Sequence, residues 1–226
     1  MTLRPLTTTS TDLATLVTEQ VDQHGTAVHS YCASADQGDR QSFVHNLVDF
    51  ADFVHLVTDL HGQLPGLIDH AAVHTVDIEA RGWLLSAIDG FAVEREYLNQ
   101  LCVDVGPVPS TIGHNETSTI VAQQRHALEM LAQSERRGCA LATAVTLTLE
   151  WHAIRKILDV GALRLGIEPP LCKLPDRDET LALLDNLPDP ARLSRAFDFG
   201  ATQLLAQHRG MWDLLCARAA ARQTQG

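Results

Sequence analysis

Apolar residues recur at intervals of three and four along most of the chain, which is the spacing of amphipathic helices. No segment alternates between apolar and polar residues as strands do. The pattern predicts a short helix at about residues 179–185 and six long helices at about residues 11–32, 41–60, 76–103, 115–135, 139–165 and 190–222. The expected fold is all-α, a single-domain bundle of about six long helices over residues 1–226, with residues 1–10 and 223–226 as flexible ends.

Segments rich in Gly and Pro separate the predicted helices, at residues 61–66, 104–113 and 166–178. Proline cannot donate to the helix ladder, and glycine readily ends helices. Asp189 before Pro190 is typical of a helix start, and Asp176 with Glu179 has the spacing of a capping box. The apolar face changes phase at Gly138, which favours a break between the fourth and fifth long helices.

Composition and charge narrow the class of protein. The chain has 226 residues, of which 45% are apolar and 5% aromatic, as expected for one helical domain. A net charge of −11 without long Lys/Arg runs argues against nucleic acid or an anionic membrane as a partner. Five widely separated cysteines indicate reduced thiols. The N-terminus lacks an apolar signal segment and no uncharged run could span a bilayer, so we expect a cytoplasmic protein.

One uncharged run, residues 139–149, is followed closely by Glu150 and His152. Helical residues advance about 100° each, which places Glu150 on the same side as the apolar positions 147 and 154. His152 falls on the other side and is expected to be replaceable. In the last helix, His208 interrupts an apolar stripe of the same kind. The register therefore predicts that Glu150 and His208 face the interior.

Further polar residues are expected to point inward from other helices: Gln20, His24, Glu94, Arg95 and Gln124. Buried polar groups need partners. One solution is a hydrogen-bond network in which Glu150 pairs with Arg95 or a histidine.

The other solution is a ligand site, because helical bundles build di-metal carboxylate centres from inward Glu and His side chains. On that interpretation Glu150 and His208 bind iron, manganese or zinc, with His24 and Glu94 next. The cofactor-binding residues would then include His24, Gln20, Gln124 and Arg95.

Two further clusters have spacings that suit metal ligands. Asp52 and His55 resemble half of a Glu-x-x-His motif, although they lie along what reads as the solvent face of an amphipathic helix. His70, His74 and Asp77 recur at i, i+4 and i+7, as zinc ligands on one helical face do. Surface histidines are the alternative interpretation of the second cluster.

Two resemblances to known families add expectations. The segments QQRHALEMLAQSERRGCA (123–140) and LLAQHRGMWDLLCAR (204–218) resemble an uncharacterised all-helical family of alphaproteobacteria, a domain of unknown function, which implies no activity. The segment TEQVDQHGTAVH (18–29) is similar to the first helix of heme oxygenases, in which a histidine holds the heme iron. This similarity implies a heme-oxygenase-like fold with His24 as the heme ligand.

Three functions follow as expectations. The first is a ferritin-like or heme-oxygenase-like bundle that binds a metal or small ligand in its polar interior, with Glu150 and His208 as catalytic residues of a metal-dependent oxidoreductase. The second is a structural or regulatory helical protein with a buried hydrogen-bond network, whose amphipathic faces pair with another chain, a homodimer included. The third is heme binding through His24.

Overall fold

A computed structural model describes residues 12–33, 42–111 and 113–224. The predicted flexible ends lie outside these residues, except for Gln223 at the end of the last helix and Thr224, which caps it. Regular structure in the described residues is helical, and no strand occurs among them. None of these helices is long and apolar enough to cross a lipid bilayer.

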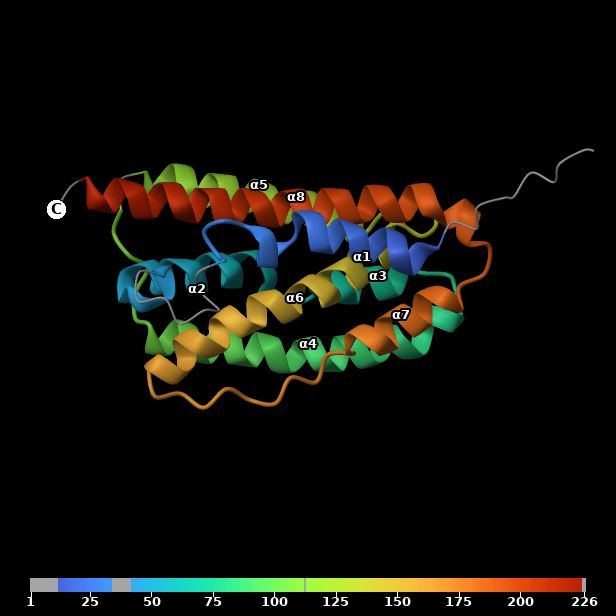
Figure 1. Ribbon diagram of the computed structural model, residues 1–226, viewed down its shortest axis with the longest axis horizontal. Helices are drawn as coiled ribbons and strands as arrows, with labels where there is room; N and C mark the ends of the chain where they lie inside the picture. Colours follow the sequence, from blue (N-terminus) through green and yellow to red (C-terminus); the bar gives the residue numbers. More distant parts are fainter. Residues whose placement is uncertain (1–11, 34–41, 112, 225–226) are drawn as a thin grey trace, which may run out of the picture.

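In the described part of the chain, eight α-helices pack into an elongated bundle with their axes running mainly along its long direction (Figure 1). Two short 3-10 turns, Thr26–Val28 and Phe43–His45, lie between the first two helices. The helices are α1 (Leu13–His24), α2 (Leu47–His61), α3 (Leu67–His74), α4 (Glu79–Asp104), α5 (His114–Ala132), α6 (Cys139–Arg164), α7 (Arg177–Asp185) and α8 (Pro190–Gln223).

Helix α6 is the centre of the bundle. It crosses between α1 and α8 on one side and α4 and α7 on the other (Figure 1), and it also contacts α3 and α5. Every residue from Cys139 to Trp151 is buried. A helix that is apolar all round has to be covered on all sides, so the uncharged run of the sequence becomes the central helix.

The helix count and several boundaries differ from the prediction. The first helix ends at His24 rather than near residue 32, because the chain becomes extended at Gly25 and then forms the 3-10 turn. The second helix begins only at Leu47, after its own 3-10 turn. Residues 67–74 form helix α3, whereas the pattern predicted no helix between residues 60 and 76. The prediction of six long helices and one short helix therefore misses α3, and the described residues form eight α-helices.

Other predicted helix ends are confirmed. Gly138 has a φ of 88°, which favours glycine, and it separates α5 from α6. Asp176 and Glu179 form the predicted capping box of α7. Asp189 does precede α8, but it has a φ of 53° and its side chain makes no capping hydrogen bond.

A buried ionic cluster ties α2 to the C-terminal part of α8. Asp52 is fully buried and accepts two hydrogen bonds from Arg218, at 2.7 and 2.8 Å, and one from Arg222 at 2.8 Å. Arg222 also donates to Asp49 at 2.6 Å. The interpretation of Asp52 as part of a solvent face is wrong, because α8 covers this side of α2 and supplies arginines to its acidic residues.

Removing one partner of this cluster is expected to destabilise the fold. Asp52→Asn leaves the buried Arg218 without its carboxylate, which costs about 3–5 kcal/mol, whereas Arg222 keeps Asp49. Asp59→Asn, on the exposed side of the same helix, is the matched control and should change the free energy of unfolding by less than about 0.5 kcal/mol. Urea unfolding followed by circular dichroism measures both. Equal, small effects would show that the cluster adds little to stability.

Candidate functional site

Glu150 lies midway along α6, and its carboxylate is fully buried. Its Oε1 accepts two hydrogen bonds from Thr26, from the backbone N–H at 2.7 Å and from the hydroxyl at 2.5 Å. Its one ion-pair candidate among the described residues is His208, whose Nδ1 lies 3.5 Å from the same oxygen. The carboxylate is therefore held by neutral donors and one histidine, without a lysine or arginine partner.

Two histidines continue the network away from Glu150. His208 of α8 and His61 at the end of α2 face one another, with 2.9 Å between their Nε2 atoms. Both side chains are buried, His208 to 1% exposure and His61 to 3%. Burial, and then the repulsion that two protonated imidazoles so close together would experience, lower the pKa of His61 well below 6.5. We call Glu150, His208 and His61 the Glu-His-His chain.

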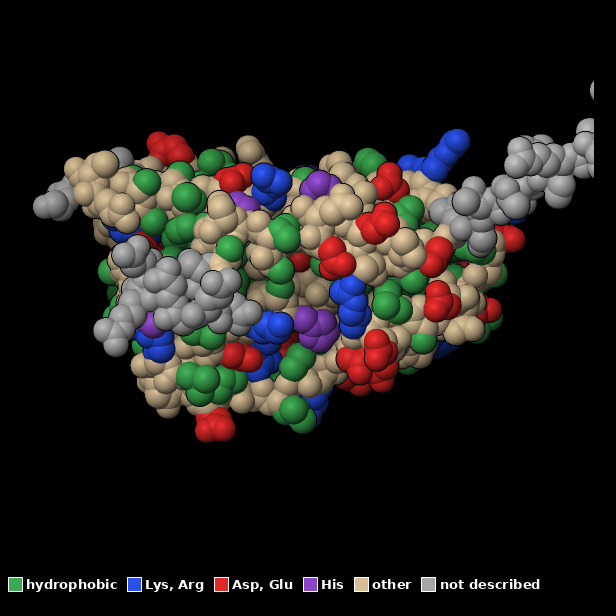
Figure 2. Space-filling view, in the orientation of Figure 1, with side chains coloured by type: hydrophobic (Ala, Val, Ile, Leu, Met, Phe, Trp, Pro, Cys, Tyr) green, Lys and Arg blue, Asp and Glu red, His purple; other side chains and the backbone are tan. Residues whose placement is uncertain are grey.

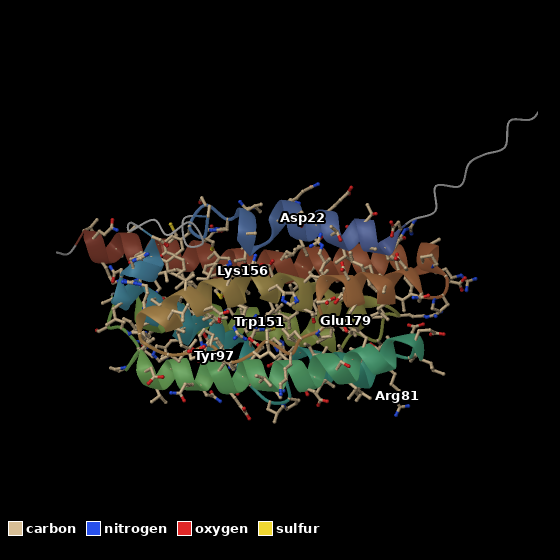
Figure 3. The ribbon with its side chains drawn as sticks, turned by 60° about the horizontal axis from the view of Figure 1, so that its bottom comes forward. Asp22, Arg81, Tyr97, Trp151, Lys156 and Glu179 are labelled. Carbon is tan, nitrogen blue, oxygen red and sulfur yellow. The ribbon has the colours of Figure 1, made fainter. Side chains whose placement is uncertain are left out.

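Several elements hold this chain in place. Trp212 of α8 donates from its indole nitrogen to the Thr26 hydroxyl at 2.8 Å, which fixes the residue that binds Glu150. His61 packs edge-on against Trp151 of α6, with 5.5 Å between ring centroids. Figure 3 shows Trp151 in the interior, between the ribbons of α6 and α4. The centre thus joins the 3-10 turn after α1 with α2, α6 and α8.

Each end of the Glu-His-His chain carries an open atom, by which we mean a buried polar atom without a hydrogen-bond partner. Oε2 of Glu150 and Nδ1 of His61 are buried and have no hydrogen-bond partner in the described residues. Buried polar atoms are nearly always hydrogen-bonded, and an exception needs an explanation such as a bound water, an ion or a reactive role. The two open atoms mark this centre as the candidate site.

Gly25 makes room for the Glu150 carboxylate. A Cβ at position 25 would lie 2.5 Å from Oε2, closer than such atoms approach in proteins. The backbone at Gly25 is extended, so glycine is required there by space rather than by φ. Any larger residue would push the carboxylate from its position.

A cavity of about 220 Å³ lies beside this centre, lined in part by Thr26, Cys32, Ala153, Lys156 and Ile157. Thr26 contributes to the wall of this cavity and also binds the Glu150 carboxylate. Burial and then the charge of Glu150 raise the pKa of the Cys32 thiol, so it stays protonated near neutral pH. The volume lies below the about 300–1,000 Å³ of typical small-molecule pockets, so only a small ligand fits.

Glu94, predicted as a further ligand, lies in a different network. Its carboxylate accepts hydrogen bonds from Arg155 at 2.5 Å and from the Trp151 indole at 2.9 Å. Arg155 also donates to Asp159 at 2.6 Å. Neither oxygen of Glu94 is left without a partner, so this network satisfies itself.

The residues predicted to face inward from α1 do not reach Glu150. His24 is exposed, and Gln20 is half-buried and donates to Asp198 at 3.1 Å. Both line a separate cavity of about 190 Å³ that includes Arg209 of α8. The prediction that His24 faces the core is wrong, because α1 ends at this residue, next to Gly25.

Arg95 and Gln124 are buried as predicted, but they have other partners. Arg95 pairs with Asp69 at 3.1 Å, so the expected pairing of Glu150 with Arg95 is not formed. Gln124 donates to the carbonyl of Gln207 at 3.1 Å. The alternative partner expected for Glu150, a histidine, is the one observed.

The two weaker metal clusters do not form as predicted. Asp52 belongs to the ionic cluster, and His55 lies with its Nε2 2.8 Å from the carbonyl of Gly106. The i, i+4, i+7 face does not exist because α3 ends at His74 and Asp77 follows it, where it pairs with Arg137 at 2.6 Å.

His70 and His152 also lie apart from the centre. The Nε2 of His70 lies 3.5 Å from the side-chain nitrogen of Gln133. His152 is half-buried, with Nε2 3.1 Å from the carbonyl of Pro175.

The predicted metal ligands are thus only partly brought together. Glu150 and His208 meet, whereas His24 and Glu94 lie elsewhere. Within the residues that the structure describes, no group of three or more His, Cys, Asp or Glu side chains is arranged to hold a metal ion. Binding of iron, manganese or zinc stays a prediction.

Three residues of the centre were not identified from the sequence: His61, Thr26 and Trp212. The apolar stripe of the second helix runs through positions 50, 54 and 57, and the next position in that register is 61. The predicted helix stops at residue 60, so His61 falls in the following loop and its place in the apolar stripe is not recognised. Thr26 was missed because the first helix was predicted to continue through it.

The two fully buried glutamates of the interior are expected to respond differently to neutralisation. Glu150→Gln keeps an oxygen for Thr26 and removes a charge that has no cation beside it, so stability should stay within about 1 kcal/mol. Glu94→Gln leaves Arg155 buried without its anion and should cost about 3–5 kcal/mol. Urea unfolding of both variants tests this. A loss at Glu150 as large as at Glu94 would assign Glu150 a purely structural role.

The lowered pKa of His61 predicts a dependence of stability on pH. Below pH 6.5 this histidine becomes protonated in the unfolded chain but not in the folded protein. The unfolded state then binds more protons, so the free energy of unfolding decreases as the pH is lowered. His61→Phe should lessen this fall relative to the wild type. Denaturation at a series of pH values between about 7 and 5 measures it, and parallel curves would contradict the assignment.

Comparison with known proteins gives a family but no activity. No curated protein matches the chain, and no solved structure does. The similarity to heme oxygenases therefore stays a prediction. The model of a family described only as a family of unknown function, DUF6975, matches residues 21–223. The match covers most of the chain, and the protein therefore belongs to this family.

Proposed function

We propose that the protein binds a small ligand at Glu150 and that the Glu-His-His chain exchanges a proton with it. The observation that carries this proposal is the open Oε2 of Glu150, a buried carboxylate oxygen without a partner. An unpaired buried charge is costly. A buried polar atom without a partner needs an explanation such as a bound ligand.

The contrast with the rest of the interior supports a functional role. Asp52 and Glu94 are equally buried, and each has arginine partners for its charge. Neither of them has an oxygen among the buried atoms without partners, whereas Glu150 does. Among the described residues, the protein therefore pairs the buried carboxylates of Asp52 and Glu94 with arginine and leaves that of Glu150 without such a partner.

The chemistry of the centre indicates the class of ligand. An ionised carboxylate only accepts hydrogen bonds, so the ligand has to donate hydrogen bonds or carry positive charge. The charge of the nearby surface also favours a positively charged ligand. Acidic side chains gather over α1 and α7 in Figure 2, where Glu19, Asp22, Asp178 and Glu179 are exposed. A negative surface raises the local concentration of small cations.

Glu150 and His208 together suit acid–base chemistry on such a ligand. A carboxylate with a histidine beside it can accept a proton and return it, which is the requirement for general acid–base catalysis. The competing function is a hydrogen-bond network with only a structural role. In that case no ligand binds, and removal of Glu150 affects only stability.

Binding can be tested with the purified wild type, with Glu150→Gln and with Thr146→Val. Thr146 is the matched control because its hydroxyl is also buried without a partner, one turn away on α6, and carries no charge. Native mass spectrometry should detect a low-mass species on the wild type and Thr146→Val, and none on Glu150→Gln. Methylammonium chloride should raise the melting temperature of the same two proteins relative to sodium chloride.

Elemental analysis of these samples tests the predicted metals as well. Iron, manganese or zinc that is lost in both Glu150→Gln and His208→Gln would identify the ligand as a metal ion. A wild-type protein that carries nothing and shows no response to methylammonium would contradict the proposed function.

A further inference from the structure

The two histidines of the centre meet in an unusual way. Their Nε2 atoms lie 2.9 Å apart, with 5.0 Å between ring centroids and 83° between ring planes. The rings therefore point at each other edge-on and share a single hydrogen bond. Two lone pairs or two N–H groups could not make this contact, so one ring donates and the other accepts.

The direction of these hydrogen bonds follows from Glu150. An ionised carboxylate cannot donate, so the proton between it and His208 belongs to Nδ1 of His208. A neutral His208 then presents a lone pair at Nε2, and His61 donates to it from its own Nε2. This assignment leaves Nδ1 of His61 as a bare lone pair, and Nδ1 is the atom that has no partner.

His61 is the last residue of α2 and lies at the corner between α2 and α3, which begins at Leu67. His61 lines a small cavity of about 10 Å³, together with Gly66, Arg125 and Glu129 among others. This volume is close to the minimum for one water molecule. Arg125 and Glu129 are exposed by more than a third and 3.7 Å apart, so they border solvent.

The other charged groups near this corner are already paired with each other. Asp69 of α3 accepts from Arg95 of α4 at 3.1 Å and from the backbone N–H of Gly66 at 2.8 Å. Among these groups, His61 is the one that contacts the interior, through its hydrogen bond to His208.

We infer that His61 and His208 form a path that carries a proton between solvent at the α2–α3 corner and Glu150. The inference rests on the proposed acid–base role of Glu150 and adds the route by which its proton is exchanged. It makes His61 a proton-transfer residue rather than a packing residue.

The transfers balance without any further reactant. A hydronium ion in the small cavity gives a proton to Nδ1 of His61 and leaves as water. His61 releases its Nε2 proton to His208, and His208 releases its Nδ1 proton to Oε1 of Glu150. Each transfer breaks one bond to hydrogen and forms one. Both histidines end neutral with the proton on the opposite nitrogen, and the reverse sequence returns a proton to solvent.

Nuclear magnetic resonance of protein labelled with ¹⁵N-histidine tests this path. The ring nitrogen shifts should identify a proton on Nδ1 of His208 and on Nε2 of His61. Exchange of the His208 ring proton with solvent should slow about 100-fold in His61→Phe, as expected when a positioned proton-transfer group is lost. His61→Gln should slow it similarly, because glutamine can keep a hydrogen bond to His208 but cannot pass a proton on.

His152→Phe is the control, since it replaces a half-buried histidine of α6 outside the path. It should leave the exchange rate unchanged, and backbone amide exchange around His208 should be the same in all variants. Unchanged ring-proton exchange in both His61 variants, or a proton on Nδ1 of His61, would overturn the inference. Either of these results would leave the proposed binding of a ligand at Glu150 untouched. Conversely, a wild-type protein that binds no ligand, with exchange that is slowed in the His61 variants, would contradict the proposed function and not the proton path.

Discussion

The burial of α6 on every side is the constraint on which the rest of the structure depends. Its first half has no polar face, so other helices have to surround it, and α1, α3, α4, α5, α7 and α8 all contact it. The first charge along the helix, Glu150, consequently enters the interior at the middle of the bundle. A carboxylate in that position has to be satisfied by neighbouring helices, and this requirement brings Thr26, His208 and His61 together.

Helical periodicity was sufficient to predict the fold class and the inward direction of two residues. The all-helical fold, the break at Gly138 and the α7 capping box are confirmed, and Glu150 and His208 are buried side by side. These features depend on residues close in sequence, whose register fixes the direction of a side chain. The pairing of Glu150 with a histidine was one of the alternatives that the register allowed.

The features that the sequence did not reveal depend on contacts between distant segments. Asp52 has the spacing of a solvent-facing residue on α2, and only the position of Arg218 on α8 explains its burial. His24 shares the register of an inward face, but the end of α1 at Gly25 leaves it exposed. His61 lies one residue beyond the predicted end of its helix. Small errors in helix boundaries thus had larger consequences for the site than for the fold.

The close approach of Gly25 to Glu150 links two positions that are 125 residues apart in the chain. A side chain at position 25 and a glutamate at position 150 cannot occupy this space together. The same Cβ would also lie 2.5 Å from the backbone carbonyl oxygen of Val21, so a shorter acid on α6 would not by itself make room for alanine at position 25. Within the family, position 25 should therefore remain glycine, whichever acid occupies position 150.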